Sequence, residues 1–393
     1  MTGKGINRPL IAIFAYNILY MAASGLLVPG TPLYLSTNGF EAGLLNLTLS
    51  FMAVSSLLGQ IIWGYLSDRV MTKLTFVELG TLSYILGYML LMALRDKLAI
   101  TIVLITSNFV GSAAYPAAMS LLADLSSDQN RGRSMGVFWS AASFGWAASV
   151  AFTGFIIERL GGVYFFGACS LLLLSSLLSV YLGFRGERQH TTTERLEPKN
   201  KTSFLRSFLG LEAPFLVFLT CSVIFFMADY VKNVYVPMFY AFELGMGMVT
   251  ATLLLSLTSW IEIPVNILFG SLSDRFGRKR MVFLGYALCG AYMIINSLAG
   301  GFEGALLAMC LYGFVWGAFS GASSALASEL VDESRRGFAM GLFNSSWNIA
   351  SMLAPASMGM LGQVFSYRLM FEVMGTLMFL SCILLVLGVR KDV

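Results

Sequence analysis

The sequence predicts an all-α membrane protein with twelve transmembrane helices in two pseudo-symmetric six-helix bundles. Of its 393 residues, 57% are hydrophobic and 12% are charged, whereas soluble domains average roughly 25% charged residues. Residues 64–69 (GYLSDR) recur as residues 270–275 (GSLSDR), at an offset of 270 − 64 = 206. A second motif, R-G-x-x-M-G, begins at Arg131 and at Arg336, at an offset of 336 − 131 = 205. Two motifs in one order at nearly one offset indicate a duplicated half.

Twelve apolar runs are long enough to cross a bilayer, which takes about 20 largely apolar residues for each helix. An even number of spans places both termini on the same side of the membrane. In chain order, the expected spans are 9–35, 42–66, 74–94, 98–124, 134–157, 162–184, 213–240, 246–271, 281–300, 304–328, 338–363 and 368–389.

The basic residues orient these spans, because short cytoplasmic loops are enriched in lysine and arginine. Of the 25 lysines and arginines, Lys232 falls inside a span, and Arg95, Lys97, Arg159 and Arg368 fall on the side opposite the termini. The remaining 20 lie on the side of the termini. Both termini are therefore expected in the cytoplasm.

One polar interval, residues 185–212, separates the two sets of six spans. We expect an N-terminal bundle at 1–184, a cytoplasmic linker at 185–212 and a C-terminal bundle at 213–393. The chain has no separate soluble domain and only one histidine, His190, which argues against a receptor, a metal centre or an enzyme. It also lacks the G-x-x-x-x-G-K-[ST] loop that ATP-driven transport from this chain would need.

The repeated loop resembles the signature of the major facilitator superfamily, G-x-L-x-D-R-x-G-R-K, which follows the second helix and often the eighth. The earlier copy has Met71 and Thr72 where glycine and arginine are usual. The matching residues are Gly64, Leu66, Asp68, Arg69 and Lys73 in the earlier copy, and Gly270, Leu272, Asp274, Arg275, Gly277, Arg278 and Lys279 in the later one. The resemblance covers the whole chain and implies the fold of that superfamily and secondary transport of a solute.

These loops are candidates for a cytoplasmic gate. Glycine lets helix ends approach, and an aspartate at a set position can meet an arginine or a helix N-terminus. The arginines expected to meet Asp68 and Asp274 are Arg131 and Arg336, which open the fifth and eleventh spans. The alternative is that all these charges only enforce topology.

Two other patterns differ from those of proton-coupled exporters in the same superfamily. Their fourth helix often carries Arg-x-x-x-Gly, where this chain has residues 107–111 (SNFVG). Their fifth helix has a Gly-Pro pair, where this chain has Ser149 and Val150. The departures weaken an assignment to the drug exporters and leave the superfamily assignment intact.

Ionisable side chains at membrane depth are functional candidates, because each costs roughly 2.5–3.5 kcal/mol on insertion scales. Asp229 and Lys232 lie three residues apart, on one helix face together with Asn233. Glu262 belongs to a stripe with Thr258 and Asn266, at a spacing of four. Glu262 has no neighbouring cation in the sequence, so we expect it to exchange a proton or to bind substrate. The alternative for Asp229 and Lys232 is a self-neutralising pair that only orders its helix. Asn17 in the first span is a weaker candidate for the cavity lining.

We therefore expect a secondary active transporter that moves a small organic solute by alternating access, with protons as the coupling ion. The expected partners are the solute, protons and the lipid bilayer, without nucleic acid, cofactor or metal. We expect a monomer in the plasma membrane. An uncoupled facilitator and a non-transporting membrane sensor on the same fold are the alternatives. The mixed charge leaves three substrate types open: a zwitterion, an anion near Lys232, or a cation near Glu262.

Overall fold

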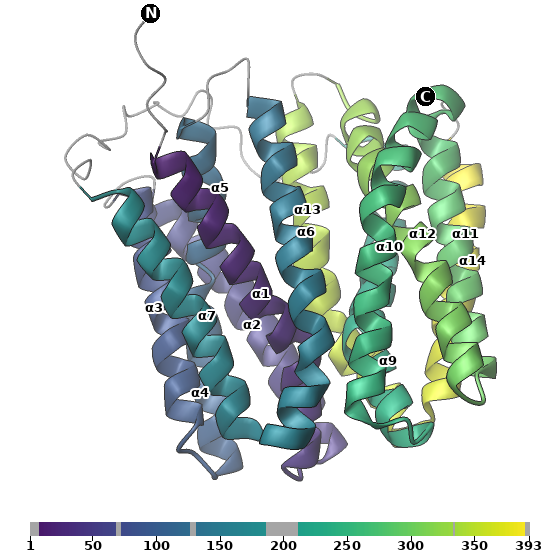
Figure 1. Cartoon of the computed structure of the whole chain (residues 1–393). Helices are drawn as coiled ribbons and strands as arrows, with labels where there is room; N and C mark the ends of the chain where they lie inside the picture. Colours follow the sequence, from purple (N-terminus) through teal and green to yellow (C-terminus); the bar gives the residue numbers. More distant parts are fainter. Residues whose placement is uncertain (1–7, 68–71, 126–130, 186–210, 333–334, 390–393) are drawn as a thin grey trace, which may run out of the picture. The chain divides into compact units, whose positions relative to one another are not determined.

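The computed structural model describes residues 8–67, 72–125, 131–185, 211–332 and 335–389, and within this part the chain forms helices and no strand (Figure 1). Eleven of the described helices are long and apolar enough to cross a membrane. The prediction of an all-α membrane protein is thus confirmed, and the count of twelve spans remains a prediction.

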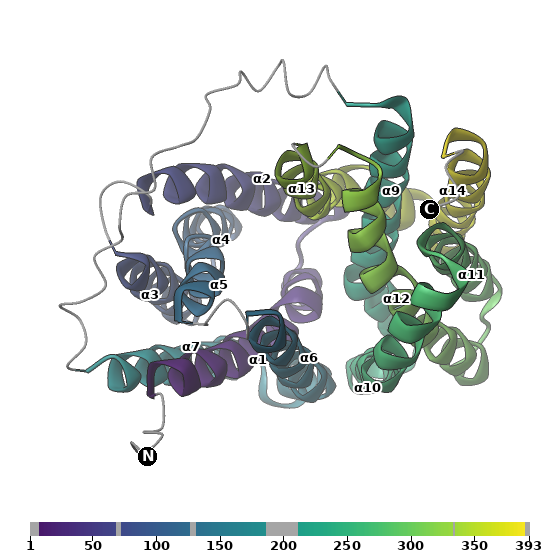
Figure 2. The ribbon, with the colours of Figure 1, turned by 90° about the horizontal axis from the view of Figure 1, so that it is seen from above.

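The first compact unit consists of Met1–Phe40 and Phe51–Leu196. Within it, α1 packs along α6 and α7, and α3 packs against α4, α5 and α7 (Figure 2). Its elements are α1 (Arg8–Thr37), α2 (Ala42–Ser67), α3 (Lys73–Leu91), α4 (Lys97–Gly111), α5 (Ala114–Leu125), α6 (Arg131–Phe155), the π-helical turn η1 (Ile156–Leu160) and α7 (Gly162–Gly183).

The second compact unit consists of Glu41–Ser50 and Glu197–Val393, so it takes in the first turns of α2. The predicted linker falls mostly at residues 186–210, outside the described residues. The other elements of this unit are α9 (Ala213–Met238), η2 (Phe239–Glu243), α10 (Gly247–Phe276), α11 (Arg278–Leu298), α12 (Phe302–Glu329), α13 (Arg336–Ala354), η4 (Pro355–Gly359), η5 (Leu361–Phe365) and α14 (Tyr367–Gly388).

Both units pair their helices in the same way. The contacts of α1 with α6 and α7 are repeated by those of α9 with α13 and α14, and those of α3 with α7 by those of α11 with α14. The π-helical turns η1 and η5 begin at residues 156 and 361, at an offset of 361 − 156 = 205. The spacing of 205 residues that separates the repeated sequence motifs therefore also separates these two π-helical turns.

The fourth expected span is broken into α4 and α5. Pro116 lies in the first turn of α5, and a proline has no N–H to donate to the carbonyl four residues earlier, which here is that of Ser112. The backbone instead turns at Ser112 and Ala113, whose N–H groups bond to the carbonyls of Asn108 and Val110. The break follows from the local sequence, and α4 and α5 together still form one apolar segment, Lys97–Leu122, long enough to cross a membrane, as expected for the fourth span.

The eleventh expected span, 338–363, is also interrupted. It consists of α13 followed by η4 and η5, and it is not among the eleven apolar helices because polar residues such as Asn344 and Asn348 lower its hydropathy. Pro355 opens η4. Since proline clashes with the carbonyl four residues before it, a widened turn at this point relieves the clash.

A polar cluster in the second unit joins the start of α2 to α9 and to the end of this interrupted helix. The Tyr235 hydroxyl donates to Asn46 Oδ1 at 2.7 Å, and Asn46 Nδ2 donates to Gln363 Oε1 at 3.1 Å. Gly359 packs directly on this bond: a Cβ there would lie 2.1 Å from the Tyr235 hydroxyl oxygen and 2.4 Å from Asn46 Oδ1. Only glycine leaves room for the hydrogen bond, which ties residue 46 to α9 within the second unit.

Candidate functional site

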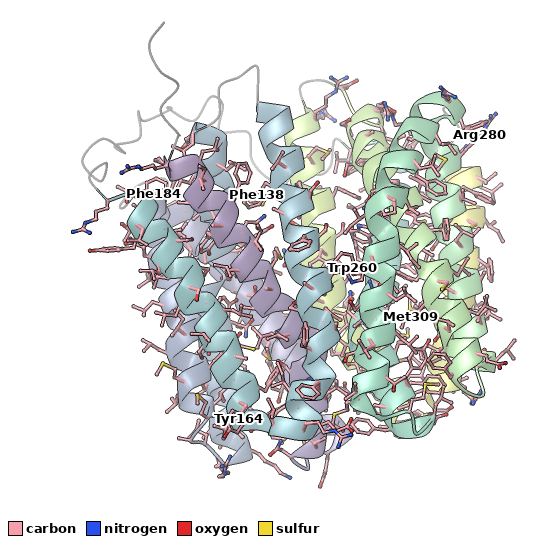
Figure 3. All side chains as sticks on the ribbon, in the orientation of Figure 1. Phe138, Tyr164, Phe184, Trp260, Arg280 and Met309 are labelled. Atoms are coloured by element: carbon pink, nitrogen blue, oxygen red, sulfur yellow. The ribbon has the colours of Figure 1, made fainter. Side chains whose placement is uncertain are left out.

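Four ionisable side chains from three helices meet inside the second unit. Asp229 and Lys232 come from α9, Glu262 from α10 and Tyr312 from α12. Trp260, two residues before Glu262, lies about half-way along α10, whereas Arg280 lies at the end of the unit (Figure 3). The cluster is therefore far from the helix ends, at the depth where charge is most expensive in a membrane.

Asp229 has donors for both carboxylate oxygens. Its Oδ1 accepts a hydrogen bond from the Tyr312 hydroxyl and lies 3.1 Å from Lys232 Nζ. Its Oδ2 accepts from Asn233 Nδ2 at 3.0 Å. Only 4% of the side chain is exposed. A buried carboxylate with this set of donors is held in one orientation.

Lys232 is enclosed on three sides. Besides Asp229, its Nζ lies 3.9 Å from Glu262 Oε1 and 4.3 Å from the centre of the Tyr312 ring. The ring face attracts the ammonium electrostatically. Because Asp229 and Lys232 are three residues apart on one helix, their pairing is built into α9, while the contacts with Glu262 and Tyr312 depend on the packing of α10 and α12.

Glu262 is the least satisfied member of the cluster. Its one described polar contact is the 3.9 Å approach of Lys232, which is longer than a hydrogen bond. Its Oε1 is buried and has no hydrogen-bond partner among the described residues. Two carboxylates and one ammonium leave the cluster with one formal negative charge when both acids are ionised. Glu262 is the group at which a proton or a cation would neutralise it.

Two glycines on α12 bring this helix against α10. A Cβ on Gly313 would lie 2.4 Å from Ile261 Cγ2, and one on Gly317 would lie 2.6 Å from Val265 Cγ1. Small residues at membrane helix interfaces allow this approach. Gly313 directly follows Tyr312, so the same close packing holds the tyrosine against the charged residues.

The other expected site residues lie around the cluster or away from it. Asn233 contacts Asp229, as described above. The Thr258 hydroxyl donates to its own helix, at Leu255 O (2.8 Å), and Asn266 accepts a hydrogen bond from Ser320 (3.3 Å). In the first unit, Asn17 Nδ2 donates to Phe138 O at 2.5 Å and so joins α1 to α6. None of these last three has a described hydrogen bond to the charged cluster.

Tyr312 is not among the site residues expected from the sequence. A tyrosine buried in an apolar helix needs a partner for its hydroxyl, and its position next to a stripe of glycines marks a helix contact. Those two signals could have selected it. They do not name its partner, because Asp229 lies 312 − 229 = 83 residues earlier.

An ion pair lies at the candidate gate in each unit. Lys73 Nζ lies 2.6 Å from Asp124 Oδ2, and Arg278 Nε lies 3.0 Å from Glu329 Oε1. The two ion pairs occupy equivalent positions in the repeat. The two cations are 278 − 73 = 205 residues apart, and the two acids are 329 − 124 = 205 residues apart. Lys73 thus provides the cation in the first unit, where Thr72 stands at the usual arginine position. Lys73 and Arg278 each pair with an acid within their own unit, at the end of the fourth or tenth expected span.

The remaining gate residues are placed as follows. Gly277 has φ +91° and ends α10, with its N–H bonded to Ser273 O at 3.1 Å, so glycine is required at this turn. A Cβ on Gly270 would meet no described atom within 4 Å, so the close approach expected there is not seen among the described residues. Gly64, Arg275, Lys279 and Arg336 lie in α2, α10, α11 and α13, while Asp68, Arg69 and the side chains of Arg131 and Asp274 fall outside the described residues.

Within the described ranges, no three or more histidine, cysteine, aspartate or glutamate side chains lie close enough to hold a metal ion. The functional groups of the cluster are two carboxylates, one ammonium and one phenol. Such groups bind and release protons and charged or polar solutes.

Comparison with known proteins agrees with the fold and the repeat. The profile of the Major Facilitator Superfamily matches residues 13–332 and 218–393. An MFS-type transporter of Methanocaldococcus jannaschii is 23% identical, over 93% of this chain and 94% of its own length. Multidrug resistance protein 2 of Bacillus subtilis is 24% identical, over 91% and 90%. The crystal structure of a D-xylose-proton symporter superposes with a TM-score of 0.75 at 16% identity, over 98% of each chain.

The family assignment rests on agreement between separate observations. The superfamily profile covers well over half of the chain, and the described residues form the apolar helices that a multi-pass membrane protein requires. The repeated loop and the paired units agree with it. The chain therefore belongs to the Major Facilitator Superfamily, a family of integral membrane transporters rather than of enzymes.

Proposed function

We propose that this protein is a proton-coupled secondary active transporter of a small organic solute, working by alternating access as a monomer in the plasma membrane. The proposal includes twelve spans, cytoplasmic termini and bundles at 1–184 and 213–393. The observation that carries it is the buried cluster of Asp229, Lys232 and Glu262 within the apolar helices of the second unit.

A purely structural role explains only part of this cluster. Asp229 and Lys232 neutralise each other within one helix, so they need no third charge. Glu262 adds a second carboxylate that has no hydrogen-bond donor among the described residues. An uncompensated buried carboxylate is destabilising, and ionisable residues within membrane spans mark ion or substrate pathways. This imbalance favours a functional role for Glu262.

In the proposed coupling step, protonation of Glu262 changes whether Lys232 is attracted to one carboxylate or to two. When Glu262 is ionised, Lys232 is attracted both to Asp229 and to Glu262. A proton on Glu262 removes the second attraction and leaves Lys232 with Asp229 and the Tyr312 ring. Since these groups sit on α9, α10 and α12, the protonation state of one carboxylate changes the forces between three helices.

Two further observations support coupling and gating. A D-xylose-proton symporter shares the fold, so this architecture accommodates proton coupling. The ion pairs Lys73–Asp124 and Arg278–Glu329 each join two helix ends within one unit. We include them, with the loop residues around Asp68 and Asp274, in a cytoplasmic gate. An uncoupled facilitator remains the second candidate, in which Glu262 and Lys232 contact the solute directly.

The test uses the purified protein reconstituted in liposomes, with a solute identified by a ligand-stabilisation screen. Glu262→Gln mimics the protonated carboxyl. It should abolish accumulation driven by a pH gradient and retain exchange between equal solute pools, because binding survives while the proton cycle does not. Glu372→Gln, at an exposed position on α14, is the matched control and should behave as wild type.

Other outcomes decide against the proposal. If binding and exchange fall together in Glu262→Gln, the residue contacts the solute and the uncoupled facilitator is favoured. If the variant keeps the wild-type pH dependence of flux, Glu262 is structural and Asp229 is the remaining carboxylate to test.

A further inference from the structure

The contacts of the cluster rank the three substrate types that the sequence leaves open. An anion would have to bind at Lys232, whose ammonium already meets Asp229 at 3.1 Å, Glu262 at 3.9 Å and the Tyr312 ring at 4.3 Å. Only 6% of that side chain is exposed. An incoming anion would displace a pairing built into α9 and would lie beside Glu262, which carries the same sign of charge.

Beside the Asp229–Lys232 pair, two buried acceptor atoms have no hydrogen-bond partner among the described residues, and the Tyr292 hydroxyl, whose ring packs on that of Tyr312 at 4.8 Å, is unpartnered as well. Glu262 Oε1 and Asn233 Oδ1 are both buried without a hydrogen-bond donor among the described residues. Asn233 is 5% exposed, and its other amide atom, Nδ2, is held by Asp229. Both residues adjoin the Asp229–Lys232 pair. Two acceptors without donors, next to one uncompensated negative charge, fit a ligand that carries both N–H groups and a positive charge.

We propose that the solute recognised at Glu262 is an organic amine in its protonated form, and that it is exchanged against a proton. This inference rests on the proposed transport function and names its substrate class. Among the described residues, the charged groups that face Glu262 are Asp229 and Lys232 from α9, and the titratable group from α12 is the neutral Tyr312 hydroxyl. With Asp229 and Lys232 already paired, one proton or one monovalent cation suffices to neutralise Glu262.

The exchange balances in charge and atoms. The protonated Glu262 carboxyl releases its proton to water, and the ammonium N–H of the amine then donates to the resulting carboxylate. Because both cations use the same carboxylate, they cannot occupy it together, so amine and proton move in opposite directions. One proton is exchanged for each monovalent amine, and the exchange carries no net charge across the membrane.

Binding by the purified full-length protein tests the charge preference without transport. The probes share one skeleton: phenylpropylammonium, its N-trimethyl derivative, phenylpropanoate and phenylpropanol. Phenylpropylammonium should raise the melting temperature and release about one proton for each molecule bound, measured with a pH indicator in weak buffer. Its apparent Kd should rise by up to about tenfold for each unit that the pH falls, because the proton competes.

The variants test whether binding depends on Glu262, and the remaining probes test whether it depends on charge and on N–H groups. Glu262→Gln should lose both binding and proton release, Glu262→Asp should retain part of each, and Glu372→Gln should match wild type. The trimethyl probe should bind more weakly, because it offers no N–H to the two acceptors. The proposal is overturned if phenylpropanoate binds better, if phenylpropylammonium does not bind, or if its binding releases no proton.

Transport then separates the two proposals. In liposomes, amine-driven proton movement should not change when a potassium gradient and valinomycin impose a membrane potential; a potential-dependent rate would contradict the one-for-one exchange. If the amine binds and releases a proton but drives no flux, the substrate class stands and the transport proposal fails. If a carboxylate solute drives a proton flux that Glu262→Gln abolishes, transport stands and the amine class is wrong.

Discussion

Tyr312 contacts the charged pair of α9 in two different ways: its hydroxyl donates to Asp229, and its ring faces Lys232 Nζ at 4.3 Å. The two contacts can be separated, because phenylalanine keeps the ring and loses the hydroxyl. The tyrosine thus links α12 to both charges of the pair.

Tyr312→Phe should lower the free energy of unfolding by about 1.5–3 kcal/mol, the usual range for a hydrogen bond to a charged group. Asp229 would lose one donor while Lys232 keeps the aromatic ring. Tyr115→Phe is the control, because the Tyr115 hydroxyl is buried without a described hydrogen bond. Thermal unfolding of the two purified variants should show a loss only for Tyr312→Phe. Equal losses would mean that the hydrogen bond to Asp229 adds nothing.

Lys232→Met should be strongly destabilising, by about 3–5 kcal/mol, because it leaves two buried carboxylates without their cation. The loss should shrink as the pH falls, since protonation removes the repulsion between Asp229 and Glu262. Adding Glu262→Gln should recover part of the loss, with a coupling energy of about 0.5–3 kcal/mol in a double-mutant cycle. Strictly additive effects would show that Glu262 does not interact with this pair.

Gly359→Ala should destabilise the second unit by about 1–3 kcal/mol, because the added methyl overlaps the Tyr235 hydroxyl and Asn46 Oδ1. Gly341→Ala in α13 is the matched control: no described atom lies within 4 Å of its Cβ position, so helix propensity should raise stability by up to about 1 kcal/mol. The two variants should therefore shift the melting temperature in opposite directions. A neutral Gly359→Ala would show that the contact relaxes without strain.

The ion pairs at the helix ends should contribute little to stability. Arg278 and Glu329 are each 31% exposed, so Arg278→Gln should change the free energy of unfolding by only about 0.2–1 kcal/mol. Under the gating proposal, the same variant should raise the reactivity of a cysteine placed at Ser320 in a cysteine-free background. Exchanging the charges, as Arg278→Glu with Glu329→Arg, should restore low reactivity. Unchanged reactivity in all three proteins would leave only the topological role.

Much of the fold could be predicted because its determinants lie within the sequence. Apolar length sets each span, the motif offsets near 205 reveal the duplicated half, and the glycine at position 277 marks a turn. The pairing of Asp229 with Lys232 could also be predicted, since a spacing of three places two side chains on one helix face.

What only the tertiary structure decided is which residues from other helices complete the site. Helix periodicity gives the direction of a side chain within its own helix, but the partner it meets depends on how helices pack. Thr258 and Glu262 share a spacing of four, yet the Thr258 hydroxyl bonds to its own backbone, while Glu262 lies beside Lys232 of α9. Tyr312 joins them because Gly313 and Gly317 let α12 approach α10. The sequence by itself determined which charges lie in the membrane. The packing of three helices decided that Glu262 is the member of the cluster whose Oε1 has no hydrogen-bond donor among the described residues.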